Sequence, residues 1–193
     1  MIRLYRAPWS TNVERVTLAL AHKGLEAESV WIEYSDRSDV ERVSGQPLVP
    51  VIEDDGTVVH DSLAILRHLE ARHPDPPLFP AEPARRAELD LFLDWFDGVW
   101  KHAPNAIEAD PSRTEELAAV MDGHLDLVES MLQGRDFLTG DRLTAADCAA
   151  YPFLKYAVSR DPEDDEAFHV ILEAHQSADG RPNLEAWISR VGA

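Results

Sequence analysis

Residues 73–84 read HPDPPLFPAEPA and contain five prolines. Proline lacks a backbone N–H and has a fixed φ, so this segment interrupts helices and favours an extended, semi-rigid connection. We interpret it as a linker that divides the chain into two domains, residues 1–80 and residues 81–193.

Before the linker, β-prone runs alternate with a helical pattern. The runs IRLY (2–5) and SVWIE (29–33) flank a segment, residues 12–23, in which apolar residues recur every three or four positions. This order predicts two parallel strands joined by a crossover helix.

Closer to the linker, a polar stretch (36–44) precedes the apolar run LVPVI (48–52) and the run TVVH (57–60). An Asp-Gly dipeptide at 55–56 joins the two runs and predicts a hairpin. Asp61-Ser62 then begins a further helix. The first part is therefore predicted to be a βαβ–α–ββ–α unit of the α/β class.

After the linker the sequence indicates helices alone. Apolar residues repeat at helical spacing in residues 89–100 and 117–132, and helical patterns recur in residues 165–175 and from Pro182 onward. Between them, Thr144 and Asp147 have the spacing of a capping box, with Asp in the place of the usual Glu, and Pro152 is expected to kink the helix that they begin.

Composition excludes several classes of protein. The chain has 193 residues, with 18 Lys and Arg against 36 Asp and Glu, so nucleic acid and acidic membranes would be repelled. Its single cysteine, Cys148, cannot form an internal disulfide, and no cluster of Cys and His has the spacing of zinc ligands. With no apolar leader or spanning segment, we expect a cytoplasmic protein without metal.

Four segments carry a resemblance to a known family: WSTNVERV (9–16), SGQPLVPVI (44–52), VVHDSLAILRHLE (58–70) and LTAADCAAYPFL (143–154). In this order and spacing, the chain resembles cytosolic glutathione S-transferases of a serine-type or omega-like bacterial class. The resemblance implies a thioredoxin-like glutathione-binding domain over residues 1–80, a C-terminal helical bundle over residues 81–193, and a homodimer.

The resemblance gives Val49 and Pro50 a place in the glutathione site. In the family this proline follows a cis bond, and the backbone of the preceding residue, here Val49, pairs with the cysteinyl part of glutathione. Without the neighbouring motifs, Pro50 would be read as an ordinary trans proline in a turn.

Asp61 and Ser62 match the Glu/Gln-Ser pair with which the family holds the γ-glutamyl carboxylate. A helix N-terminus suits this task because it has unpaired N–H groups and the positive end of the helix dipole. Asp61 is one methylene shorter than the usual residue, which weakens the expectation that it reaches the ammonium group of the ligand. The alternative for this pair is simple N-capping.

Ser10 is the residue expected to carry the chemistry. The thiol of glutathione has a pKa of roughly 8.5, so a hydroxyl donor beside the sulfur and the following helix N-terminus would favour the thiolate. Serine in place of cysteine disfavours a mechanism through a mixed disulfide. Thr11 and Asn12 are rival donors, and Ser10 is also a candidate N-cap.

Other conspicuous side chains are read structurally. Thr144 and Asp147 match the buried capping box of the family, and Cys148 is expected in the core. Trp9 and Trp100 are candidates for the wall of an apolar co-substrate pocket, although Trp100 also fits a core position on a helical stripe.

The leading prediction is a glutathione transferase that stabilises the thiolate for attack on an electrophilic co-substrate. Isomerase, dehalogenase or peroxidase chemistry on the same fold is one alternative. Another is a non-catalytic protein-binding module that docks a partner through the helical part, which contains 23 acidic and 10 basic residues. Since glutathione is itself anionic, binding would depend on local positive features, namely helix N-termini and Arg15.

Overall fold

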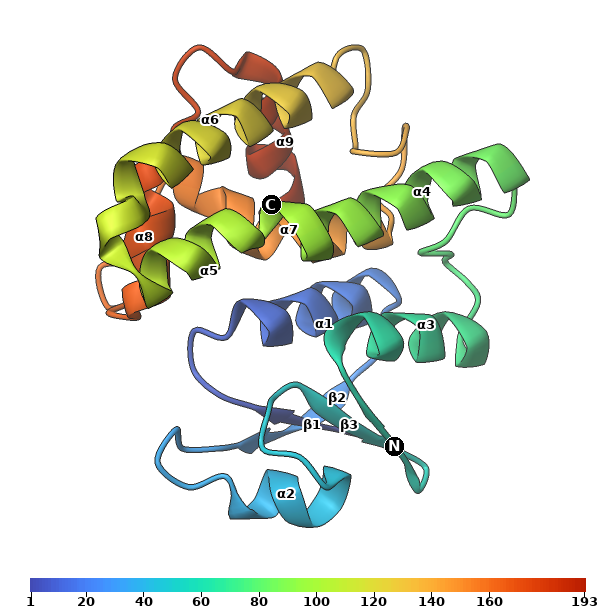
Figure 1. Cartoon of the computed structure of the whole chain (residues 1–193). Helices are drawn as coiled ribbons and strands as arrows, with labels where there is room; N and C mark the ends of the chain where they lie inside the picture. Colours follow the sequence, from blue (N-terminus) through green and yellow to red (C-terminus); the bar gives the residue numbers. More distant parts are fainter. The chain divides into compact units, whose positions relative to one another are not determined.

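The computed structural model describes all 193 residues, and the chain divides into two compact units, Met1–Phe79 and Pro80–Ala193. This boundary lies within the proline-rich segment, one residue before the position expected from the sequence. Figure 1 shows a mixed sheet with helices in the first unit and helices alone in the second.

The first unit is built on a four-stranded sheet with the order β2-β1-β3-β4. β1 pairs in parallel with β2, and β3 is antiparallel to both β1 and β4. The strands are β1 (Ile2–Arg6), β2 (Ala27–Trp31), β3 (Val51–Asp54) and β4 (Thr57–His60). The parallel pair and the hairpin confirm the topology predicted from the sequence.

Three helices cover this sheet. α1 (Thr11–His22) and α3 (Ser62–Arg72) lie on one face, and α2 (Ser38–Ser44) lies on the other (Figure 1). Val40 of α2 is fully buried and belongs to a core cluster with Tyr5 and Val51 of the sheet. The fold is thioredoxin-like, with helices on both faces of the sheet and the most buried residues on β1 and β3.

The first half of the proline-rich segment is fixed to the first unit. The buried ammonium of Lys23, just after α1, donates to Glu70 Oε2 over 2.7 Å and to the carbonyls of His73 and Pro76 over 2.6 and 3.0 Å. Glu70 also accepts the backbone N–H of Leu78. The semi-rigid connection expected from the sequence is thus anchored in its first half, because a buried cation holds the carbonyl groups of His73 and Pro76.

The second unit is helical throughout. α4 (Pro83–Trp95) continues into a π-helical turn (Phe96–Trp100), in which the N–H of Lys101 reaches the carbonyl of Phe96. The remaining helices are α5 (His102–Ala109), α6 (Thr114–Met131), α7 (Ala145–Leu154), α8 (Ala167–His175) and α9 (Pro182–Val191), with short 3-10 turns at Pro111–Arg113 and Lys155–Ala157. Pro152 lies in the last turn of α7, and α5 was not predicted from the sequence.

Candidate functional site

Ser10 lies at the N-cap of α1. Its Oγ accepts the backbone N–H of Val13 over 3.4 Å, and its carbonyl accepts the N–H of Glu14. The capping role is therefore present. A hydroxyl that accepts through a lone pair keeps its own hydrogen, so the same side chain can donate to an anion beside the helix N-terminus.

The backbone turns sharply just before Ser10. Trp9 has a φ of 57°, a left-handed conformation that costs a non-glycine residue about 1 kcal/mol or more. This turn sets Ser10 at the start of α1, and Trp9, the residue before it, is 37% exposed. Thr11, one of the two rival donors, is buried, and Asn12 is half-buried.

The Val49–Pro50 peptide bond is cis, as the resemblance implied. Val49 lies just before β3, beyond the last pair of the β1–β3 ladder, Tyr5 and Val51. Its backbone groups are therefore outside the sheet. The turn in front of it is held by the Gln46 side chain, whose amide bonds to both the N–H and the carbonyl of Leu48, a contact that the sequence did not reveal.

At the N-terminus of α3, Asp61 is the N-cap and Ser62 is the first helical residue. Asp61 has a φ of 72°, and its Oδ1 accepts the backbone N–H of Ala64 over 2.9 Å, so one carboxylate oxygen serves the helix. The side chain of Ser62 is buried, and its Oγ accepts a hydrogen bond from Nη1 of Arg15 over 3.3 Å. Arg15, expected from the sequence to supply local positive charge, thus contacts Ser62, a residue predicted to bind the ligand.

Comparison with known proteins gives this geometry a context. Residues 4–77 match the glutathione S-transferase N-terminal domain, and residues 105–190 match the C-terminal domain. The chain belongs to the glutathione S-transferase family.

Individual proteins of this family are similar to this chain over most of its length. Glutathione S-transferase GstB of Escherichia coli K12 is 27% identical over 207 residues, covering 99% of this chain and 93% of that protein. FtsZ-localized protein A of Caulobacter vibrioides is 31% identical over 166 residues, covering 76% and 73%. A glutathione S-transferase structure from Rhodospirillum rubrum F11 has a TM-score of 0.77 at 25% identity, covering 100% of this chain and 88% of that one.

In this transferase-family chain, Trp100 occupies the core of the helical unit. Its side chain is 1% exposed, its ring stacks on Phe96 with centroids 4.5 Å apart, and Phe153 meets it edge-on. The alternative that Trp100 walls a co-substrate pocket is not supported, because the packed aromatic rings enclose it. Trp9 keeps the exposure that such a role requires.

The capping box of α7 is formed as expected for the family. Thr144 caps the helix, and Oδ2 of Asp147 accepts the backbone N–H of Thr144 over 2.8 Å. Both side chains are buried, as is Cys148. These residues stabilise the helical unit and are remote in sequence from the candidate site.

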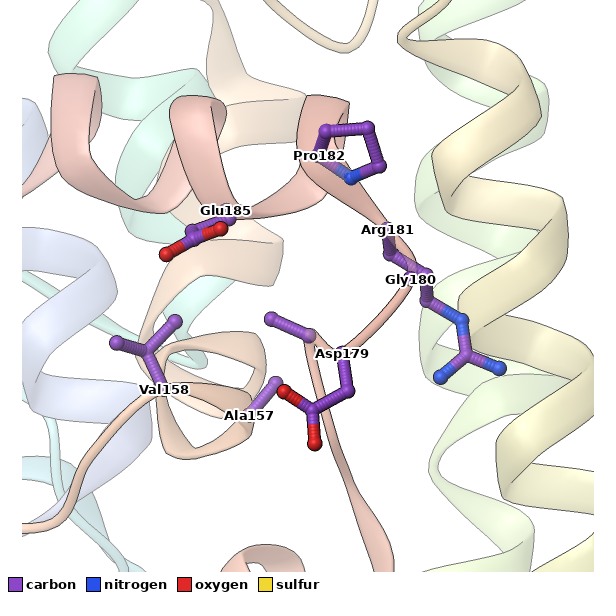
Figure 2. Close-up of a pocket in the computed structure, with 8 residues that line it drawn as sticks. Ala157, Val158, Asp179, Gly180, Arg181, Pro182 and Glu185 are labelled. Carbon is purple, nitrogen blue, oxygen red and sulfur yellow. The ribbon is translucent and has the colours of Figure 1, made fainter.

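The helical unit of this family member also contains a polar pocket of about 350 Å³, drawn in Figure 2. Carboxylates of Asp179 and Glu185 line it, whereas the Arg181 guanidinium points away toward α6, where it pairs with Asp122 and Asp126. None of the residues predicted to bind glutathione lines this pocket, and its acidic lining is unsuited to an anion.

Two further properties concern metals and membranes. The structure has no group of three or more His, Cys, Asp or Glu side chains placed to hold a metal ion. None of its helices combines the length and the apolar character needed to cross a membrane.

Proposed function

We propose that this chain binds glutathione in the unit Met1–Phe79 and joins its sulfur to an electrophilic carbon of a co-substrate, which transfers the whole glutathionyl group. The observation that carries the proposal is the position of Ser10, at the N-cap of α1 with a hydroxyl hydrogen left to donate. Membership of the glutathione S-transferase family supports the identity of the thiol.

The chemistry follows from the state of the sulfur. A thiol with a pKa of roughly 8.5 is mostly protonated at neutral pH, and the nucleophile is the thiolate. A hydrogen bond from Ser10 and the positive end of α1 stabilise the anion, while the proton passes to solvent. The sulfur then forms a bond to the electrophilic carbon, and the leaving group departs with its bonding electron pair.

Two other segments hold the rest of the tripeptide in this proposal. The backbone groups of Val49, outside the ladder and next to the cis bond of Pro50, pair with the cysteinyl residue. Ser62 and the N-terminus of α3 hold the γ-glutamyl carboxylate. Asp61 already uses one oxygen to cap α3, so its second oxygen is the one available to the ligand ammonium.

The first experiment is a calorimetric titration of the protein with glutathione, followed by a rate measurement with an activated aryl chloride. We expect saturable binding and release of chloride with formation of the thioether. Absence of binding at millimolar glutathione would remove the proposal. Binding without conjugation would favour the isomerase, dehalogenase or peroxidase alternatives, which are tested with the corresponding substrates.

A protein-binding role is the second candidate. It is favoured by the 31% identity to FtsZ-localized protein A over 76% of this chain. In this case the acidic helical unit would dock a partner. Co-sedimentation with FtsZ polymers tests it, and a Ser10→Ala variant should co-sediment as well as the wild type if docking does not need the thiol site.

We also propose a homodimer, through an apolar hollow between α4 and α6 of about 300 Å³. Leu91 and Leu127 beside it are 72% and 45% exposed, and together with the hollow they form an apolar surface that a second copy of the chain would cover. The lining residues are Glu88, Leu91, Phe92, Trp95, Leu127 and Met131.

A cytoplasmic location, expected from the single cysteine, is also part of the proposed function and is tested by cell fractionation.

A further inference from the structure

Arg15 is a charged residue withdrawn from solvent. It lies on α1, its exposed fraction is 0%, and Nη1 donates to Ser62 Oγ. Removing a guanidinium from water costs several kcal/mol unless its donors are satisfied, so buried arginines are rare. This contact joins the helix that Ser10 caps to the helix that Ser62 begins, and α1 packs against α3.

The charge of Arg15 has an unusual position. Cations stabilise helices at the C-terminus, because the N-terminus is already the positive end of the dipole. Arg15 instead contacts the first residue of α3. The carboxylate of Asp61 already caps this helix end, and the guanidinium of Arg15 adds a positive charge there that favours a further anion. The chain carries a formal charge of -18, so such a local positive charge is needed to attract an anionic tripeptide.

The hydrogen bond also fixes what Ser62 can do. A guanidinium has donors and no acceptor, so Ser62 Oγ accepts from it. The hydroxyl hydrogen is then left to donate elsewhere. Ser62 is 4% exposed and its own backbone N–H is one of the unpaired donors of the first helical turn. Because Arg15 occupies an acceptor lone pair of Ser62 Oγ, the Ser62 hydroxyl is oriented to donate a hydrogen bond at the N-terminus of α3.

We propose that Arg15 is a positioning residue for the γ-glutamyl carboxylate, acting through the hydroxyl of Ser62. The inference rests on the glutathione-binding function proposed above and adds the residue that makes the site selective for a ligand with this carboxylate. Arg15 itself does not touch the ligand in this scheme. The effect of Arg15 on binding affinity must therefore disappear when the Ser62 hydroxyl is removed from the protein or the γ-glutamyl residue is removed from the ligand.

The test is a set of calorimetric titrations with glutathione and with cysteinylglycine, which lacks the γ-glutamyl residue. Arg15→Gln keeps a donor but loses the charge, and we expect it to weaken glutathione binding about tenfold, with cysteinylglycine binding unchanged. The double variant Arg15→Gln/Ser62→Ala should bind glutathione no more weakly than Ser62→Ala alone.

The controls separate this role from a structural one. Val16→Ala shortens a fully buried side chain next to Arg15 in the sequence of α1 and should lower the melting temperature without changing the ratio of the two affinities. An equal loss for both ligands in Arg15→Gln, or no loss for either, overturns the inference. Failure of the wild type to bind glutathione is a different outcome and removes the proposed function instead.

Folding of the variants is monitored by thermal unfolding. If Arg15→Gln does not fold, Arg15→Lys, which retains the charge, takes its place: we expect it to bind glutathione more weakly than the wild type, with cysteinylglycine binding unchanged. Ser62→Ala keeps Arg15 in place and tests whether the Ser62 hydroxyl contributes to the preference for the γ-glutamyl ligand. An unchanged affinity ratio in Ser62→Ala overturns the inference, because Arg15 is argued to act through that hydroxyl.

Discussion

The indole Nε1 of Trp187 donates a hydrogen bond to Oδ1 of Asp147 over 2.8 Å. The same carboxylate accepts the backbone N–H of Leu138 and both the N–H and the hydroxyl of Thr144. Burial raises the pKa of the Asp147 carboxyl, and these hydrogen bonds oppose that rise. One carboxylate thus ties the start of α7 to the loop before it and to α9.

Replacement of Asp147 by alanine should be strongly destabilising. It leaves several buried donors without a partner, at a cost of about 3 kcal/mol or more in the free energy of unfolding. Thr144→Ala, which removes the cap, should cost about 1 kcal/mol. Urea denaturation measures both, with the exposed Asp165→Ala as control. An Asp147 variant as stable as the control would contradict this role.

Ser10→Ala should separate binding from chemistry. Without the hydroxyl donor the bound thiol is less acidic, so the inflection of the pH–rate profile should move upward by about one unit and the rate at neutral pH should fall about tenfold. Glutathione affinity should change little. Loss of the cap should also cost about 1 kcal/mol of stability.

The matched control for Ser10 is Ser38→Ala, a serine at the start of α2 that is not part of the proposed site. It should leave both the pH–rate profile and the conjugation rate unchanged. If Ser10→Ala turns over at the wild-type rate with the wild-type profile, Thr11 and Asn12 become the candidates for the donor.

Asp164 should make the helical unit sensitive to acid. Its burial raises the carboxyl pKa, but hydrogen bonds from His169 and Tyr156 and the charge of His169 outweigh burial and hold the pKa below its usual value of 3.8. A group with a lowered pKa in the folded state stabilises the fold above its unfolded pKa. That contribution disappears as the pH falls through the lower, folded value.

The free energy of unfolding should therefore decrease as the pH falls below 3.8 in the wild type. Asp164→Asn should start less stable at neutral pH and show a shallower decline. Chemical denaturation at a series of pH values measures the slope, with Asp165→Asn, an exposed neighbour, as control. Equal slopes in Asp164→Asn and the wild type would exclude Asp164 as the source of acid sensitivity.

Leu91→Glu should shift the proposed homodimer toward the monomer, because it places a charge on the exposed apolar face of α4. Sedimentation velocity measures the change. Val170→Glu, at an exposed position on α8, should leave the oligomeric state unaltered. A wild-type chain that sediments as a monomer at all concentrations would rule out the dimer.

Features set by neighbouring residues could be predicted from the sequence. The hairpin around Gly56, the capping box of Thr144 and Asp147, and the start of α3 at Ser62 each depend on a few adjacent side chains. Ser10 could be placed at the start of a helix for the same reason, and the cis bond before Pro50 followed from the resemblance.

Features set by distant residues could not be predicted. Arg15 and Ser62 are 47 positions apart, and no local pattern joins them. The apolar spacing up to Trp100 fits a regular α-helix as well as the π-helical turn that the structure contains. α5, which was not predicted, has Pro104 near its start, where proline is tolerated because the first-turn N–H groups have no helical partner.

The burial of Lys23 makes it a reporter of local opening of residues 73–79. The sequence has three lysines, and the others, Lys101 and Lys155, are only partly buried, whereas the ammonium of Lys23 is enclosed by Glu70 and two carbonyl groups. An acylating reagent can reach Lys23 only when residues 73–79 detach from the first unit. The rate of Lys23 acylation, measured by mass spectrometry, therefore reports how often residues 73–79 detach. The acylation rates of Lys101 and Lys155 serve as the internal reference.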